Sequence, residues 1–535
     1  MNIEKEGDMM NYTSHRNPVY AKNGMVATSE PQASQAGLEI LRKGGNAIDA
    51  AIAVAACLTV TEPTSNGIGG DNFALVYTNN KLHGLNSSGF CPKSLTLDHI
   101  PKTGMPRFGV YPITVPGAVK GWVNLHQKFG KLPFIDVLKP AIHYAREGFV
   151  VGETVAKYWQ IAYNIYKNNL LDPMFKPWFD TFTKDGKVPQ KGEVWTLPHH
   201  ADTLEKIGLS LGMSFYQGEL ADQIDQYIRK YQGFLNKDDL ASFQSEWVEP
   251  IKTSYRGVDV YEIPPNGQGI VALMGLNILE NHTFTKKESV VTYHKQFEAM
   301  KLAFADGHAY VSEPNTMKYS SNDLLSKKYA KNRAKEITQY AKEPFAGAPE
   351  SSGTVYLATA DVYGNMVSMI QSNYMGFGSG IVIPQTGIAL HNRGHNFSLD
   401  PKSPNVLAPL KRPYHTIIPG FLMKDEEFMG PFGVMGGFMQ PQGHIQVVMN
   451  LIDFHLNPQQ ALDASRWQWM EDKLFTVEPD FPKSIINQLI KRGHEIKVDP
   501  NLGSFGRGQI ILKDLNLRTY IGGTEKRCDG TIASY

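Results

Sequence analysis

The chain has 535 residues, of which 42% are hydrophobic and 11% aromatic, so it can bury a large core. Its 53 lysines and arginines nearly balance 52 aspartates and glutamates, and the formal net charge is +1. This balance gives no global field that would attract nucleic acid or an anionic membrane, and we expect neither as a partner. The cysteines Cys57, Cys91 and Cys528 are far apart and predict neither a disulfide framework nor a metal site.

The N-terminal stretch predicts no targeting signal. Residues 1–16 contain several charged side chains and no apolar run of signal-peptide length. The most apolar segment, residues 50–60, is bounded by Asp49 and Glu62 and is too short to span a bilayer. We therefore expect a core helix at this segment and a cytoplasmic protein.

The first hundred residues predict two helices and a glycine turn. Ser29 is a candidate cap for a helix that ends at Gly44, and Asn46 for a second helix that runs through Thr59. The cluster Gly67-Ile68-Gly69-Gly70 then opens a strand over residues 73–77. A dinucleotide-binding loop would instead follow a strand and open a helix. The order here favours a tight turn near an active site over a phosphate cradle.

Residues 116–345 are predicted to be mostly helical, with a polar insertion at 167–193. Phe297, Met300 and Phe304 recur at helical spacing within a predicted buried helix over residues 293–310. We expect its histidines His294 and His308 to face solvent or to be capped. We expect His199-His200 to be a surface pair, because no acidic or cysteine partner lies at ligand spacing. The sequence therefore predicts no metal and no cofactor.

The junction Gly353-Thr354 joins a loop rich in proline, glycine and serine to a predicted β-hairpin. Residues 355–360 and 366–370 form the two strands, and Gly364-Asn365 marks the turn between them. A threonine at the start of a strand becomes reactive if the chain is cut before it. Its new α-amine, with a reference pKa of about 7.7–8.0, lies beside its own hydroxyl and can act as the general base.

Several motifs in a fixed order carry a resemblance to a known family. They are Ala27-Thr28-Ser29-Glu30-Pro31, Gly44-Gly45-Asn46-Ala47-Ile48-Asp49-Ala50-Ala51, Gly67-Ile68-Gly69-Gly70-Asp71, Val115-Pro116-Gly117, Lys411-Arg412-Pro413, Gly436-Gly437 and Thr531-Ile532-Ala533-Ser534-Tyr535. From Gly24 to Tyr535 the sequence resembles the γ-glutamyltranspeptidases (glutathione hydrolases), which are N-terminal-nucleophile hydrolases. The resemblance implies an α+β fold with a four-layer αββα sandwich. The strands predicted after Thr354 (380–383, 387–390, 415–421, 433–435 and 509–512) and the helices at 442–454 and 458–466 fit such layers.

The resemblance implies an enzyme with Thr354 as its catalytic nucleophile. The backbone N–H groups of Gly436 and Gly437 would form the oxyanion hole, and Ser372 would hydrogen-bond the nucleophile. Autocatalytic cleavage between Gly353 and Thr354 would release a large subunit, residues 1–353, and a small catalytic subunit, residues 354–535, which stay together as a heterodimer. The substrate would be a small γ-glutamyl amide such as glutathione, with water or an amine as acceptor.

The predicted substrate pocket departs from the family pattern. Ser88 stands where the family has an arginine for the donor's carboxylate, and Arg393 and Asn396 replace the residues that hold its ammonium group. His415-Thr416 replaces a serine pair, and Asn373 is a further substrate-binding candidate.

These exchanges leave three hypotheses open. The first is a γ-glutamyl hydrolase or transferase. The second is an acylase with the same mechanism that takes glutaryl or cephalosporin-type acyl groups, with Arg393 contacting a carboxylate. The third is an uncleaved, non-catalytic relative that binds a small ligand.

Overall fold

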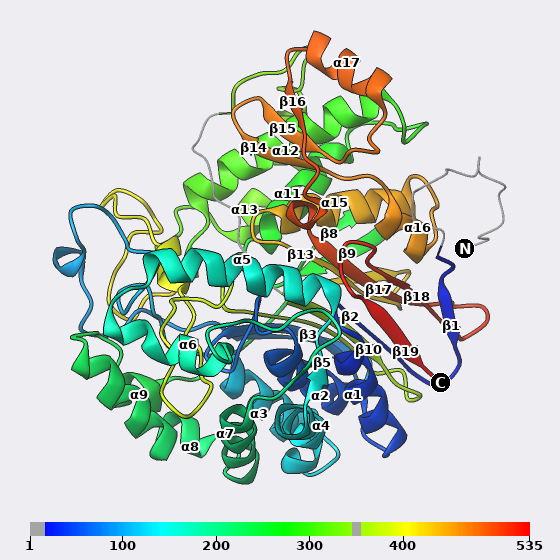
Figure 1. Cartoon of the computed structure of the whole chain (residues 1–535). Coiled ribbons are helices and arrows are strands. Elements are labelled where there is room, and N and C mark those ends of the chain that lie inside the picture. Colours follow the sequence, from blue (N-terminus) through cyan, green and yellow to red (C-terminus); the bar gives the residue numbers. More distant parts are fainter. Residues whose placement is uncertain (1–15, 345–354) are drawn as a thin grey trace.

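Two seven-stranded antiparallel sheets face each other at the centre of the molecule (Figure 1). A computed structural model of the chain describes residues 16–344 and 355–535. The first sheet runs in the order β19 (Thr531–Ser534), β2 (Met25–Thr28), β10 (Val355–Ala360), β11 (Met366–Ser372), β3 (Asp71–Thr78), β4 (Lys81–Ser87) and β7 (Glu246–Val248). The second runs in the order β1 (Val19–Ala21), β18 (Tyr520–Thr524), β17 (Arg507–Lys513), β13 (Glu427–Met435), β12 (Gly420–Lys424), β9 (Val258–Glu262) and β8 (Ile251–Tyr255).

An apolar layer joins the two sheets. Phe73, Tyr356 and Ile370 of the first sheet pack in one buried cluster with Phe421 and Met435 of the second. Strand β10 lies against β13 and β17 across this layer. The middle of the molecule is therefore a sheet-on-sheet core, as the resemblance implied.

Helices cover the outer face of each sheet and complete the αββα sandwich (Figure 1). Against the first sheet lie α1 (Pro31–Arg42), α2 (Ala47–Thr61) and α3 (Ala118–Phe129), with α4 (Phe134–Glu147) packed on α2. Against the second lie α11 (Gly269–Leu279), α15 (Met439–Ile452) and α16 (Pro458–Asp463), with α12 (Val290–Tyr310) packed on α11. Helix α2 is buried on every face, because it is covered by α1, α3 and α4 as well as by the sheet.

The remaining elements surround this sandwich. Helices α5 (Glu153–Asn169), α6 (Lys176–Phe182), α7 (Pro198–Leu209), α8 (Met213–Tyr216), α9 (Glu219–Lys230) and α10 (Lys237–Ser242) flank the first sheet, with the short pair β5 (Phe149–Val150) and β6 (Val194–Trp195). Helices α13 (Ser321–Leu324), α14 (Lys327–Ala334) and α17 (Lys483–Lys491) and a small sheet of β14 (Trp467–Glu471), β15 (Leu474–Val477) and β16 (Glu495–Val498) lie on the other side. No helix within 16–344 or 355–535 is long and apolar enough to cross a bilayer.

Most predicted elements near the sheets are confirmed. The predicted hairpin is β10–β11, in register from Val355↔Gln371 to Ala360↔Met366. Asn46 caps α2 as predicted, with its side chain accepting from the backbone N–H groups of Ile48 and Asp49. The first helix is capped by Glu30 rather than Ser29, since the Glu30 carboxylate accepts from the Ala33 N–H at 3.0 Å.

Several predictions in the connecting regions were wrong. Residues 116–345 are mostly helical as predicted, but they also contain the strands β5 to β9, which were not predicted. The alternation of Val258 and Val260 with polar residues in β9 is the strand signal in the sequence. The strands predicted at 380–383 and 387–390 are reduced to a bridge between Val382 and Ala389, because this part of the chain runs as loops. His200 and His294 are buried rather than at the surface, each packed under neighbouring elements that the sequence does not reveal.

Candidate active site

The start of β10 lies beside Ser372 and faces the end of β13. Gly353 and Thr354, the predicted cleavage site and nucleophile, lie outside the described residues, and Val355 begins the strand. Val355 pairs with Gln371, and Ser372 follows Gln371 as the last residue of β11. Across the sandwich, the Tyr356 ring contacts Gly433 so closely that a Cβ at Gly433 would lie 2.5 Å from it. The fold therefore brings the first residues after Thr354 next to two of the predicted catalytic elements.

Gly436 and Gly437 form the turn that joins β13 to the N-terminus of α15. Their φ angles are +139° and +60°, in the region that favours glycine. Within the described chain, neither glycine N–H has a hydrogen-bond acceptor, whereas the two carbonyls accept from Met439 at 3.0 Å and Gln440 at 3.2 Å. The N-terminal end of a helix carries a partial positive charge. Two adjacent donors at this end suit the binding of a developing oxyanion.

A fully buried carboxylate, Asp71, organises the neighbouring polar cluster. It pairs with Ser372 across β3 and β11, so it lies one strand away from β10. Its Oδ2 accepts from His415 Nε2 at 2.8 Å, Arg393 Nε at 3.0 Å and His391 Nδ1 at 3.1 Å. These three partners lie more than 300 residues further along the chain, Arg393 at the start of a short 3-10 helix, Arg393–Asn396.

The contacts within this cluster determine the protonation states of Asp71 and His415. Burial acts to raise the pKa of Asp71, but His391 and His415 hold that pKa well below its usual value, so Asp71 is ionised. Burial, reinforced by the Arg393 charge, lowers the pKa of His415 to about 3. Neutral His415 donates through Nε2 to Asp71 and accepts at Nδ1 from the Ile417 N–H at 3.4 Å. The Asp71 charge is therefore already balanced inside the protein.

Arg393 is a buried cation with part of its hydrogen-bonding capacity unused. Besides the Asp71 contact, its Nη1 donates to Thr416 Oγ1 at 2.8 Å, and its guanidinium lies 4.4 Å from the centre of the Tyr374 ring. Its Nη2 has no acceptor among residues 16–344 and 355–535, although the side chain is 0% exposed. An arginine has five N–H groups, and unmatched buried donors are uncommon. Arg393 therefore keeps a buried N–H donor at Nη2 that no acceptor of the described chain uses.

Asn373 and Asn396, two further predicted substrate-binding residues, lie beside Tyr374. Asn373 follows Ser372 and is fully buried, and neither atom of its side-chain amide has a partner in the described chain. Asn396 has both amide atoms engaged, because its Oδ1 accepts from the Tyr374 hydroxyl at 3.0 Å and its Nδ2 donates to the Tyr414 carbonyl. The Tyr374 N–H also donates to Ser372 Oγ at 2.8 Å.

A glutamine connects this pocket to the glycine turn. Gln268 Nε2 donates to the Thr416 carbonyl at 2.7 Å and to the Gly437 carbonyl at 2.8 Å. The structure therefore brings together Ser372, Asn373, Arg393, Asn396, His415, Thr416, Gly436 and Gly437.

One group of possible metal ligands occurs elsewhere in the described chain. Ligand atoms of His294, Glu298 and His494 lie within 4.8 Å of one another. Lys301 Nζ, however, lies 2.6 Å from Glu298 Oε1 and already supplies the positive charge. His294 Nδ1 and His494 Nε2 are hydrogen-bonded to each other at 2.8 Å. These contacts describe a buried cluster between α12 and the segment that precedes β16, separate from the elements of the site.

Comparison with known proteins decides the family. The gamma-glutamyltranspeptidase family model matches residues 33–535. The chain belongs to this family. It is 38% identical over 494 residues to the glutathione hydrolase-like YwrD proenzyme of Bacillus subtilis (strain 168), covering 90% of this chain and 93% of the relative. It is 32% identical over 516 residues to the glutathione hydrolase proenzyme of Escherichia coli (strain K12), covering 91% and 88%.

A solved structure supports the same assignment. The crystal structure of cephalosporin acylase from Bacillus halodurans is 58% identical to this chain, with a TM-score of 0.95 and 99% coverage of both chains. The predicted family, αββα fold and enzyme class are thereby confirmed. The chain is a gamma-glutamyltranspeptidase-family amidohydrolase.

Sequence reasoning missed several residues that build this gamma-glutamyltranspeptidase-family site. The sequence marks Asp71 only as the end of a glycine motif, and it does not predict that Gln268 or His391 contacts the predicted site residues. The glycine motif itself was read correctly as a turn near the site: a Cβ at Gly70 would lie 2.5 Å from the Ser372 carbonyl oxygen. An aspartate directly after such a turn is the signal that could have identified Asp71.

Proposed function

We propose that the protein is an N-terminal-threonine amidohydrolase that accepts acyl groups carrying a terminal carboxylate. The Thr354 Oγ attacks the amide carbonyl, and the threonine α-amine takes the hydroxyl proton. The N–H groups of Gly436 and Gly437 stabilise the tetrahedral oxyanion. Collapse expels the amine, which leaves with the proton, and water or another amine then releases the acyl group from its ester with Thr354.

The same nucleophile accounts for maturation. In the precursor, Thr354 Oγ attacks the Gly353 carbonyl carbon, and the peptide bond becomes an ester with a free Thr354 amine. Water hydrolyses this ester to give a carboxylate on Gly353 and the restored hydroxyl. The subunits 1–353 and 354–535 remain associated, because strands from both are hydrogen-bonded to each other in each of the two sheets. The proenzyme names of relatives support this step.

The preferred acyl group follows from the unpartnered Nη2 of Arg393, and this observation carries the proposal. A substrate carboxylate can accept from this buried donor, and charge-assisted hydrogen bonds are about twice as strong as neutral ones. The site carboxylate Asp71 is already engaged by Arg393, His391 and His415, so it offers little to a substrate ammonium group.

A glutaryl amide supplies the carboxylate and lacks the amine that a γ-glutamyl amide carries. This distinction favours the acylase hypothesis over γ-glutamyl transfer, and the similarity to a cephalosporin acylase supports it. Glutathione and other γ-glutamyl amides are the second candidates, because they also carry the carboxylate and two of the relatives named above are glutathione hydrolases or like them.

Two measurements test the proposal. The intact mass of the purified protein, with N-terminal sequencing of the smaller fragment, should identify a chain that begins at Thr354. A Thr354→Ala variant should remain one uncleaved chain without amidase activity. If the parent chain stays intact and inactive, the protein is a non-catalytic relative.

The acyl preference is tested with three 4-nitroanilides. Glutaryl, γ-glutamyl and butyryl anilides share one leaving group and differ only in the carboxylate and the amine. We expect kcat/KM to be highest for glutaryl and lowest for butyryl. A γ-glutamyl anilide that exceeds the glutaryl anilide would assign the protein to γ-glutamyl transfer.

A further inference from the structure

A buried network of four charged residues lies behind the end of β13. Arg466 Nη2 contacts Glu525 Oε2 at 2.7 Å, and Arg527 contacts Glu525 Oε1 at 2.5 Å and Glu478 Oε2 at 2.6 Å. Burial acts to raise the pKa of Glu525, but Arg466 and Arg527 lower it to about 2. The network holds two cations and two anions, so its formal charge is balanced.

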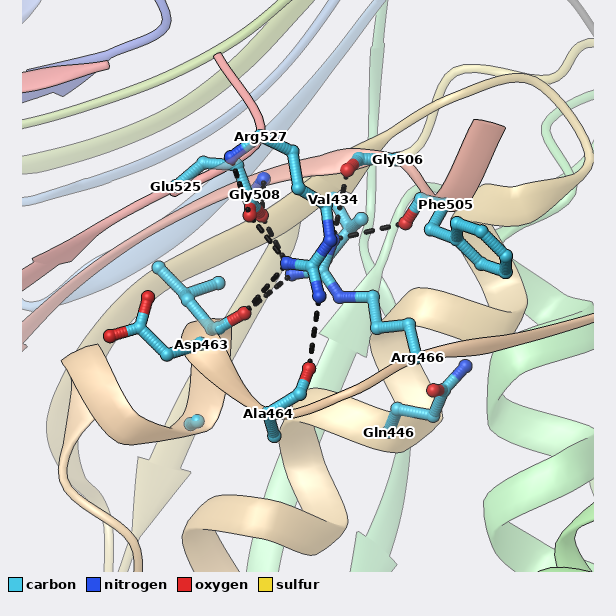
Figure 2. A network of polar contacts seen from close by, with 12 residues as sticks. Val434, Gln446, Asp463, Ala464, Arg466, Phe505, Gly506, Gly508, Glu525 and Arg527 are labelled. Atoms are coloured by element: carbon cyan, nitrogen blue, oxygen red, sulfur yellow. Dashed lines mark hydrogen bonds and ion pairs between the residues drawn. The ribbon is translucent and has the colours of Figure 1, made fainter. Parts of the chain in front are cut away.

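The two arginines hold different parts of the backbone (Figure 2). Arg466 Nη1 donates to the carbonyls of Phe505 and Gly506, both at 3.0 Å. Arg527 donates to the carbonyls of Leu462 at 2.9 Å and Ala464 at 3.0 Å, at the end of α16, where Arg466 Nη2 also donates to Leu462 at 3.5 Å. Of the two arginines, Arg466 is therefore the one that contacts the Phe505-Gly506 turn.

The Phe505-Gly506 turn packs against the backbone of Gly436. Gly506 has a φ of +75°, and a Cβ there would lie 2.6 Å from the Met435 carbonyl oxygen. A Cβ at Gly436 would lie 3.1 Å from the Gly506 Cα. The next residue, Arg507, pairs with Met435 in the sheet. A shift of the turn would consequently move the backbone that aims the Gly436 N–H.

The network also holds the strand that follows the turn. Glu525 Oε2 accepts from the Gly508 N–H at 2.8 Å, and Gly508 pairs with Val434 of β13. A guanidinium suits this position because it donates to two carbonyls and a carboxylate at once, in a fixed planar geometry.

We propose that Arg466 is a positioning residue for the oxyanion hole: through Phe505 and Gly506 it holds the Gly436-Gly437 turn in its transition-state geometry. This inference rests on the proposed function, which assigns the oxyanion hole to these two glycines. Arg466 does not touch the substrate. Its effect is on kcat, because a misplaced oxyanion donor weakens transition-state binding more than ground-state binding.

The test compares Arg466→Met with Arg527→Met in the processed protein. Each variant removes one cation from the same buried network, so both should lower the melting temperature. We expect Arg466→Met to lower kcat for the best anilide by roughly 10- to 100-fold with KM changed less than about threefold, whereas Arg527→Met keeps kcat within about threefold. Rates are normalised to the fraction of chains that begin at Thr354.

A boronic acid analogue of the acyl group gives a second readout. It forms a tetrahedral adduct with a nucleophilic hydroxyl, so its affinity should fall in Arg466→Met in parallel with kcat/KM. If a methionine variant does not fold, Arg466→Lys and Arg527→Lys provide the same comparison, and Arg466→Lys should be the slower of the two.

The outcomes separate the two proposals. Equal losses of kcat in the Arg466 and Arg527 variants, or a change in KM alone, would overturn the positioning role while the parent's activity upholds the proposed function. A parent chain that neither processes nor hydrolyses any of the three anilides would overturn the proposed function, and the positioning role with it.

Discussion

Replacing Arg393 with methionine should remove the carboxylate preference of the enzyme and leave its basal chemistry. The guanidinium uses Nε for Asp71 and Nη1 for Thr416, so Nη2 is the donor available to an acyl carboxylate. A hydrogen bond to a charged group contributes about 1.5–3 kcal/mol, which corresponds to roughly 10- to 150-fold in kcat/KM. The loss should appear with the glutaryl anilide and be absent with the butyryl anilide.

The assay is a two-by-two comparison of enzyme and substrate. The kcat/KM of the parent and of Arg393→Met is measured with glutaryl and butyryl 4-nitroanilides. The glutaryl-to-butyryl ratio of the parent, divided by that of the variant, isolates the contact with the carboxylate. An Arg393→Lys variant is the matched control for charge, and it should retain part of the preference because an ammonium still donates. Processing and melting temperature are recorded for each variant, since Asp71 loses a partner.

Equal losses of kcat/KM for the two anilides would refute the contact between Arg393 and the substrate carboxylate. If Arg393→Met lowers kcat/KM equally for both anilides, Arg393 acts only by supporting the fold around Asp71. A preserved glutaryl preference would mean that another group binds the carboxylate.

Three further predictions concern the same scaffold. Asp71→Asn should lower the free energy of unfolding by about 3–5 kcal/mol in chemical denaturation, since it leaves buried Arg393 without its anion, whereas Asp180→Asn at an exposed ion pair should change it by less than about 1 kcal/mol; equal effects would contradict the role of Asp71. Gly436→Ala should reduce kcat by up to roughly 100-fold, the loss expected when one oxyanion donor is removed. The φ of Gly436 is +139° and the new Cβ would contact Gly506, so the backbone would have to shift; an unchanged kcat would argue against this oxyanion hole. The contribution of His200 and His308 to stability should fall as the pH drops from about 6.5 towards 4, because burial lowers the pKa of each to about 4 and the unfolded chain then binds protons that the folded chain does not. Each of these histidines should remove about 1 kcal/mol by pH 5.5, whereas Glu30, whose pKa burial raises to about 7, acts in the opposite direction; equal losses of stability between pH 7.5 and 5.5 in the parent and in His200→Gln would disprove the contribution of His200.

Local sequence patterns determined much of the secondary structure around the site. The hairpin of β10 and β11 was predictable from two runs of strand-favouring residues on either side of Gly364-Asn365. The start of α2 was predictable from Asn46, which caps the helix. These features depend on residues that are close in sequence, so the sequence contains the whole signal. The motif order from Gly24 to Tyr535 likewise pointed to the family that the comparisons show.

Only the tertiary structure decided how the pocket is charged. The sequence presents Arg393 as an unpaired cation, but the fold places Asp71 against it from 322 positions away, and two histidines complete the cluster. Arg466 likewise has no local pattern that would link it to Phe505 and Gly506. Side-chain chemistry is set by residue type, whereas pairing, burial and therefore protonation depend on which distant segments the two sheets bring together.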